Sequence, residues 1–176
     1  MRKALHIMGI LNDTDVEWLV DHGTKQLVPA GTILIRQGEP IEFLTIILEG
    51  ECAIRLGRVD GPQVATLLTG EILGEISFAD SRPPSAFVIA SSTTLVLQIS
   101  RDLLREKLAD DDAFGSRFYR ALATFLADRL RTTTSRFGYG QHKEDMDPDE
   151  LDDPSMENIA VAASRFDSVL RRLRVN

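Results

Sequence analysis

Between Lys25 and Ser100 the chain alternates between short apolar runs and turn residues. The apolar runs are KQLV, TILI, FLTIIL, CAIRLG, VATLL, AFVIAS and TLVLQIS, and the segments between them include PAG, QGEP, EG, VDGP and TGE. Short runs rich in β-branched residues, bounded by Gly and Pro, are typical of β-strands. Their spacing of roughly 8–12 residues predicts seven or eight strands in a sandwich or jelly roll.

The hydrophobic period is helical on both sides of this β-rich region. NDTDVEWLVDHG begins with capping residues and predicts a short N-terminal helix. After Ser100, SRDLLREKLADD predicts a second helix, and residues 112–137 predict a long amphipathic one. The apolar stripe of the long helix contains Phe114, Phe118, Leu122, Phe125, Leu126 and Leu130. It must pack on the sheet, on another copy of the chain, or on both. Arg129 near its end suits the helix dipole.

These patterns predict a mainly β fold with flanking helices (α+β). The expected architecture is an eight-stranded double-stranded β-helix, or jelly roll, with an N-terminal helix and C-terminal helices. We expect residues 1–137 to hold the β-roll and the long helix, and residues 138–154 to form an acidic flexible linker. Residues 155–176 are predicted to form an amphipathic helix that docks on the body or on a partner, because its apolar seam is too short for an independent coiled coil.

Composition narrows the classes of function. The formal net charge of −7 argues against general affinity for nucleic acids, which needs basic surface. No apolar run approaches the roughly 18 residues that span a bilayer, and the first residues do not resemble a signal peptide, so we expect no membrane partner and a cytoplasmic location. The single cysteine, Cys52, lies in an apolar run and is interpreted as a small buried hydrophobic residue.

The sequence contains no pattern that indicates catalysis. A metal-dependent β-roll needs histidines clustered on its strands, whereas His6, His22 and His142 all lie outside the strand region. A nucleophile elbow, a phosphate-binding P-loop, a dinucleotide fingerprint and HExxH are all missing. We therefore predict a protein that is not an enzyme and has neither metal nor cofactor.

The order of elements resembles that of the cyclic-nucleotide-binding domain family over roughly residues 5–137. The resemblance rests on PAGTILIRQGEPIEFLTIILEGECAI, in which Gly31, Gly38 and Gly50 fall at the family's turns. It rests further on GEILGEISFAD and SAFVIA, which match the family's phosphate cassette. The family includes the catabolite activator protein, protein kinase A regulatory subunits and nucleotide-gated channels.

The resemblance implies a ligand site around one short helical turn. Gly74 and Glu75 match the cassette, in which the glutamate accepts a hydrogen bond from the ribose 2′-hydroxyl. Ile76 and Ser77 would contribute amides to the cyclic phosphate, because a helix N-terminus offers unpaired N–H donors to an anion. Ala86 also matches the family pattern. The alternative for Glu75 is a helix-start glutamate that the dipole and nearby amides satisfy without a ligand, and the match of the flanking residues favours the pocket role.

The chain departs from the family at the residue that normally neutralises the phosphate. The family places an arginine two residues before the alanine, and this chain has Pro84 there. Losing such a charged hydrogen bond costs about 1.5–3 kcal/mol. Arg82 could compensate by reaching the anion, or it could be an ordinary loop arginine. Ser85 could donate to a phosphate oxygen or simply stabilise the turn.

Two hypotheses for function follow from these residues. In the first, the chain is a stand-alone sensor of cAMP, cGMP or another cyclic nucleotide, which signals through its C-terminal helices. In the second, it has lost nucleotide binding and serves as a homo-oligomeric or adaptor module. In both, a protein partner or a second copy would bind the helix around Phe118, Leu122 and Phe125 together with the tail helix. Direct DNA binding is not expected, since one terminal helix cannot form a two-helix reader.

Overall fold

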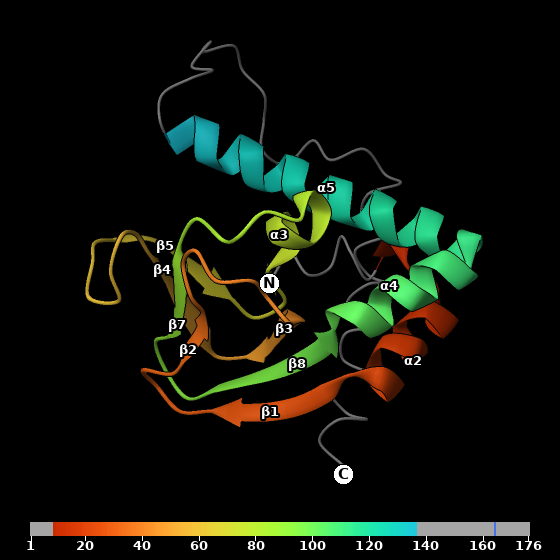
Figure 1. The fold of residues 1–176 in the computed structure, drawn as a ribbon, viewed down its shortest axis with the longest axis horizontal. Helices are drawn as coiled ribbons and strands as arrows, with labels where there is room; N and C mark the ends of the chain where they lie inside the picture. Colours follow the sequence, from red (N-terminus) through yellow and green to blue (C-terminus); the bar gives the residue numbers. More distant parts are fainter. Residues whose placement is uncertain (1–8, 137–163, 165–176) are drawn as a thin grey trace.

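The computed structural model describes residues 9–136 and Ser164. Helices flank a β-roll, and Figure 1 shows the order of the elements. They are α2 (Asp13–His22), β1 (Thr24–Val28), β2 (Ile33–Ile35), β3 (Phe43–Glu49), β4 (Glu51–Arg55), β5 (Gln63–Leu68), β6 (Ile72–Leu73), α3 (Glu75–Asp80), β7 (Phe87–Ala90), β8 (Thr94–Ser100), α4 (Arg101–Asp110) and α5 (Asp112–Arg136).

The strands form two four-stranded sheets of antiparallel pairs. One sheet has the order β1-β8-β3-β6 and the other β2-β7-β4-β5. Strands distant in sequence are paired: Ile46 of β3 lies opposite Leu97 of β8, and Ala53 of β4 opposite Ile89 of β7. The predicted mainly β fold with flanking helices is therefore confirmed. Strand β6 has two residues and was not among the apolar runs read as strands.

A hydrophobic core fills the space between the sheets. It contains Ile35, Ile47, Cys52, Leu67, Leu73 and Val88, contributed by both sheets. Cys52 is fully buried, as expected for a small hydrophobic residue. Burial raises the pKa of its thiol to about 11, so the thiol stays protonated and unreactive near neutral pH.

A second and larger core joins the helices to the outer face of the first sheet. Residues of α2, α4 and α5 pack there against Leu44, Ile46, Leu97 and Ile99. Phe118, Leu122 and Phe125 belong to this core and are only 3–4% exposed. The expectation that a partner contacts these three side chains is therefore wrong, because the chain's own sheet and α3 already cover them. Tyr119 and Leu130 remain exposed on α5.

An ion pair with a buried carboxylate ties the N-terminal helix to the long helix. Asn12 and Asp15 form a capping box at the start of α2, which confirms the helix predicted there. The Asp15 carboxylate also accepts from the Arg117 guanidinium, with Nε–Oδ2 at 2.6 Å and Nη2–Oδ1 at 2.8 Å. Such a paired fork fixes both distance and orientation, so α5 is held in place at its N-terminal half.

Two predicted segments, the acidic linker and the docking helix, follow the long helix in the sequence. The linker expected over 138–154 and the docking helix expected over 155–176 lie outside the described residues, Ser164 excepted.

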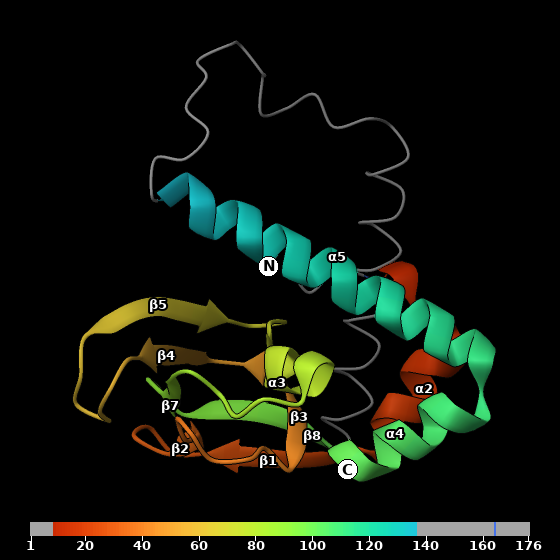
Figure 2. The same ribbon diagram turned by 45° about the horizontal axis from the view of Figure 1, so that its top comes forward.

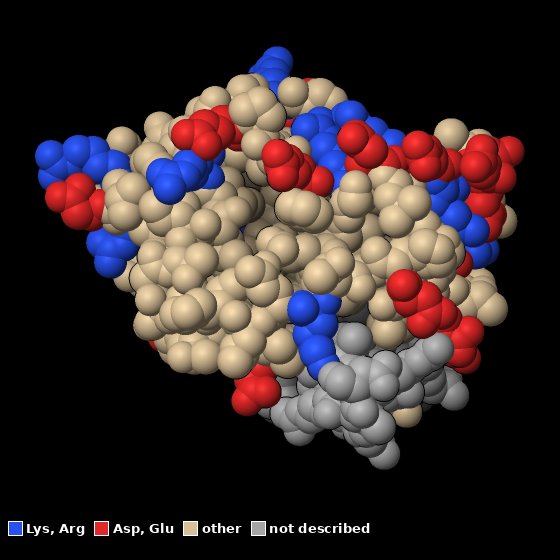
Figure 3. All heavy atoms as spheres, turned by 60° about the horizontal axis from the view of Figure 1, so that its bottom comes forward, with Lys and Arg blue, Asp and Glu red and all other residues tan. Residues whose placement is uncertain are grey.

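None of the described helices is both long enough and apolar enough to cross a membrane. Figure 3 shows a broad face, on the side where β1 lies in Figure 1, with few charged side chains in its centre. The described residues in the centre of that face therefore do not form the basic patch that binding to nucleic-acid phosphates requires.

Candidate functional site

The predicted ligand turn begins where β6 ends and α3 starts. Gly74 is the N-cap of α3 and has a left-handed backbone with φ of 84°. A Cβ atom at this position would lie 2.9 Å from Ile41 Cδ1 and 3.3 Å from the Phe43 carbonyl oxygen. Glycine is therefore required both by the backbone angle and by the close approach of the neighbouring loop.

The first turn of α3 presents a row of backbone amides. The first intrahelical bond runs from the Phe78 amide to the Gly74 carbonyl oxygen at 2.9 Å. The amides of Glu75, Ile76 and Ser77 precede that bond and have no intrahelical acceptor. The Ser77 side chain is buried, whereas the Ile76 side chain is 53% exposed. The structure thus brings together the four predicted residues from Gly74 to Ser77 in one turn.

Glu75 is buried and paired with an arginine of the long helix. Its carboxylate accepts a hydrogen bond from Arg129 Nη1, and its side chain is only 3% exposed. The Arg129 guanidinium also lies 5.6 Å from the centre of the Phe125 ring. Helix α5 runs past α3 in both Figure 1 and Figure 2. One contact thus links the predicted ligand turn to α5.

Burial dominates the ionisation of Glu75. Removal from water raises the pKa of its carboxyl, and the positive charge of Arg129 offsets only part of that effect. The Glu75 backbone amide also favours the ionised form, while the nearby charge of Glu71 opposes it. The Glu75 carboxyl consequently takes up a proton at a higher pH than an exposed glutamate does.

This raised pKa predicts how stability depends on pH. Between the unfolded pKa of about 4.3 and the higher folded value, the folded protein retains a proton that the unfolded chain has lost. The contribution of Glu75 to the free energy of unfolding therefore falls as pH rises through this window. We expect wild type to lose stability relative to Glu75→Gln as pH increases from 4 to 8. Urea unfolding of both proteins measures the difference, and a difference that does not change with pH would contradict the prediction.

The segment after α3 carries the other predicted ligand residues. Arg82 and Ser85 are exposed and Ala86 is half-buried, with no helix or strand between Ser81 and Ala86. The Arg82 amide donates to Asp80 Oδ1 at 2.9 Å, and within residues 9–136 its guanidinium has no ion pair. The Pro84 carbonyl oxygen accepts from the Gly38 amide at 2.9 Å, which ties the segment to the loop before β3.

Sequence reasoning missed the role of Arg129. From the sequence, Arg129 is interpreted as a cation near the end of a helix, where it suits the helix dipole. In the structure it donates a hydrogen bond to Glu75. The spacing carried a signal, because Phe118, Leu122, Phe125 and Arg129 follow one another at intervals of four, three and four residues. Arg129 therefore continues the buried stripe, where an arginine needs an acid partner. Phe78 of α3 is a core residue and is 5% exposed.

Comparison with known proteins assigns the family. A family model described as the cyclic nucleotide-binding domain matches residues 25–111, from β1 to the residue that ends α4. Residues 25–111 belong to the cyclic nucleotide-binding domain family. Members of this family that resemble the chain occur in regulatory proteins. Among the described residues, no group of three or more His, Cys, Asp or Glu side chains could hold a metal ion.

The alignments with named relatives cover only part of each relative's chain. The CRP-like cAMP-activated global transcriptional regulator of Mycobacterium tuberculosis is 30% identical over 118 residues, which are 64% of this chain and 51% of that protein. The cAMP-dependent protein kinase regulatory subunit of Aspergillus niger is 30% identical over 74 residues, which are 42% and 18% of the two chains. The chain thus spans about half the length of the first relative and less of the second.

A solved structure supports the same fold. The cyclic nucleotide-binding domain from Methylobacillus flagellatus superimposes with a TM-score of 0.69 at 26% identity, over 82% of this chain and 85% of that one. This match extends beyond the residues of the family model. It agrees with the expectation that helices flanking the roll belong to the same architecture.

Proposed function

We propose that the chain is a non-enzymatic regulatory protein whose cyclic nucleotide-binding domain senses a cyclic nucleotide through a divergent cassette. The observation that carries the proposal is the turn from Gly74 to Ser77, which has a glycine N-cap, first-turn amides without an intrahelical acceptor and a buried glutamate. The named relatives are a cAMP-activated regulator and a cAMP-dependent kinase subunit. We infer cAMP, cGMP or another cyclic nucleotide as the ligand.

The turn supplies the chemistry that a cyclic nucleotide requires. The amides of Ile76 and Ser77 would bind the cyclic phosphate, since the start of a helix carries unpaired donors and partial positive charge. Glu75 would accept a hydrogen bond from the ribose hydroxyl. Arg82 and Ser85 would supply the charge and the hydroxyl that Pro84 does not, because both are exposed on the segment that follows α3.

Arg129 provides a means to transmit binding to the long helix. Its guanidinium donates a hydrogen bond to the Glu75 carboxylate. A ribose hydroxyl that bonds the same carboxylate would compete with Arg129, so binding would loosen the contact between α3 and the end of α5. If α5 has two positions, ligand binding would shift the equilibrium between them by the difference in the ligand's affinity for the two states.

The output would be a change in what the C-terminal region contacts. Tyr119 is 53% exposed and Leu130 is 65% exposed on α5, so these side chains remain available after Phe118, Leu122 and Phe125 are buried. A protein partner or a second copy of the chain would bind this side of α5. Given the acidic net charge, we propose that the protein does not act through nucleic acid. We also propose that it is cytoplasmic and has no membrane partner.

Calorimetric titration tests ligand binding. We expect the purified chain to bind cAMP, cGMP or a cyclic dinucleotide with micromolar affinity, and Glu75→Ala to weaken that binding at least tenfold, because a hydrogen bond to a charged group is worth about 1.5–3 kcal/mol. Arg82→Ala should also weaken it. Glu106→Ala, which removes an exposed glutamate of α4, is the matched control and should leave affinity unchanged.

A second candidate is a domain that no longer binds nucleotide and serves as an adaptor or oligomeric module. Two observations favour it: Pro84 stands where the family has arginine, and the Glu75 carboxylate already has a partner in Arg129. If the folded protein gives no heat of binding with any cyclic nucleotide in the calorimetric titration, this candidate is favoured over the sensor.

A further inference from the structure

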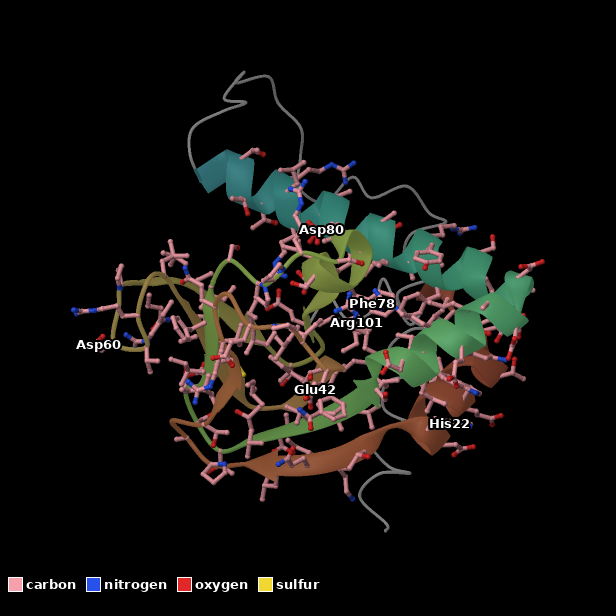
Figure 4. All side chains as sticks on the ribbon, in the orientation of Figure 1. His22, Glu42, Asp60, Phe78, Asp80 and Arg101 are labelled. Carbon is pink, nitrogen blue, oxygen red and sulfur yellow. The ribbon has the colours of Figure 1, made fainter. Side chains whose placement is uncertain are left out.

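The C-terminal end of α3 gathers two arginines around one serine hydroxyl. Ser81 Oγ lies 3.4 Å from Arg101 Nη2 and 3.1 Å from Arg105 Nη2. The two arginines are separated by four residues on α4 and therefore project from the same side of the helix. In Figure 4 the labels of Phe78 and Arg101 fall together where α3 meets α4. This cluster lies at the opposite end of α3 from Gly74 and Glu75 and touches the ligand turn only at the Ser77 carbonyl oxygen.

The cluster has more positive charge and more donors than its neighbours satisfy. Arg101 Nη2 also donates to the Ser77 carbonyl oxygen at 3.2 Å, but its buried Nε has no hydrogen-bond partner. The Arg105 guanidinium lies 5.9 Å from the centre of the Phe78 ring. Within residues 9–136, neither arginine has an ion pair with a carboxylate. Two guanidinium groups thus meet at a neutral oxygen, where a group with double negative charge would be stabilised by both.

The backbone at Ser81 would suit glycine better than serine. Its φ is 60°, and it is the one described non-glycine residue with a positive φ. At Gly31, Gly38, Gly50, Gly57, Gly70 and Gly74 the chain uses glycine for this conformation. A serine here accepts an unfavourable backbone angle and contributes a hydroxyl that glycine lacks. Ser81, Arg82 and Pro83 are exposed, and they form the start of an irregular segment that an enzyme can reach.

We propose that Ser81 is a phosphorylation site and that Arg101 and Arg105 hold the phosphoryl group. The serine oxygen attacks the γ-phosphorus of a nucleoside triphosphate on a separate protein kinase. The bond from that phosphorus to the bridging oxygen breaks, the nucleoside diphosphate leaves, and the hydroxyl proton passes to the kinase base. The product carries about −1.5 to −2 charge with three acceptor oxygens, which matches two guanidinium groups.

Phosphorylation would fasten the ligand-turn helix to α4. Phosphoserine 81 would replace a hydrogen-bonded hydroxyl by charged bonds that join the end of α3 to the first two turns of α4, and α4 leads directly into α5. It would also neutralise two like charges that repel one another at present. The proposal does not depend on nucleotide binding, because none of its three residues contacts Glu75 or Arg129.

Phosphoserine encoded at position 81 of the full chain tests whether the arginines receive the group. The control protein carries phosphoserine at Ser91, an exposed residue between β7 and β8. In phosphorus NMR titrations we expect the phosphoserine 81 pKa to lie at least one unit below that of phosphoserine 91. Arg105→Gln should remove at least half of the difference. Equal titration of the two phosphates, or no response to Arg105→Gln, would overturn the proposal.

A labelling experiment tests whether Ser81 is modified. The chain is incubated with radiolabelled ATP and a clarified lysate of the cells that produce it. We expect label in wild type and in Ser91→Ala and at least a tenfold loss in Ser81→Ala. Label that persists in Ser81→Ala, or no label in wild type, would overturn the assignment. Thermal melting of Ser81→Ala checks that the variant is folded, and the same loss in the equally exposed Ser85→Ala would also count against Ser81.

Discussion

Replacing Arg129 with alanine is expected to lower the free energy of unfolding by about 3 kcal/mol at pH 8, where the Glu75 carboxyl is ionised most fully. The loss is large because the Glu75 side chain is 3% exposed and would keep a buried negative charge without a partner. Because burial raises the pKa of this carboxyl, proton uptake limits the loss at lower pH. Urea unfolding followed by circular dichroism at pH 8 and pH 5 measures both values.

Two variants separate the lost ion pair from a general effect on α5. Arg131→Ala removes an exposed arginine two residues further along the same helix and should change stability by less than about 0.5 kcal/mol. The double variant Arg129→Met with Glu75→Gln removes both charges and should recover at least half of the loss. If Arg129→Ala and Arg131→Ala cost the same, Arg129 does not pair with Glu75 in the folded protein.

Arg129→Ala also bears on signalling. If Arg129 competes with the ribose for Glu75, its removal should strengthen binding of a cyclic nucleotide about tenfold, since one charged hydrogen bond is no longer displaced. The variant would at the same time lose the link from the ligand turn to α5. Weaker binding in Arg129→Ala would instead show that the guanidinium assists the ligand, which contradicts the competition.

Phe114→Ala is expected to destabilise the protein by about 3–5 kcal/mol, the usual cost of removing a fully buried aromatic ring. Phe114 is completely buried where three helices meet, with its ring centre 5.5 Å from Trp18 on α2 and 5.7 Å from Phe118 on α5. Lys107 of α4 lies 5.4 Å from the same ring. The cavity would therefore weaken the packing of all three helices at once.

The single tryptophan makes this prediction easy to measure. Trp18 stacks on His22 and faces Phe114, so its fluorescence reports unfolding of the helical core. Tyr119→Ala is the matched control on α5, because this ring is 53% exposed and should cost about 1 kcal/mol or less. A loss below about 1.5 kcal/mol for Phe114→Ala would mean that the helices do not share the core described above.

Local pattern was enough to predict the β-roll and its helices. Most strands of the roll bury residues on one or both faces, so short apolar runs separated by glycine and proline turns mark them without knowledge of their partners. The capping residues Asn12 and Asp15 act within one turn, and the helix they start was equally visible. The turn from Gly74 to Ser77 is local too, which is why a resemblance in sequence located it. Strand β6 escaped because two residues show no period.

Tertiary structure decided what each of these parts contacts. The apolar stripe of α5 could have faced a second copy, and only the packing of α5 on the sheet and α3 shows that Phe118, Leu122 and Phe125 are buried within one chain. Glu75 and Arg129 are 54 residues apart, and Ser81 and Arg105 are 24 apart. Sequence by itself determined the fold and the position of the α3 turn that we propose as the ligand site, because these depend on neighbouring residues. The partner of Glu75 and the pair of arginines at Ser81 depend on how helices cross, which no local pattern encodes.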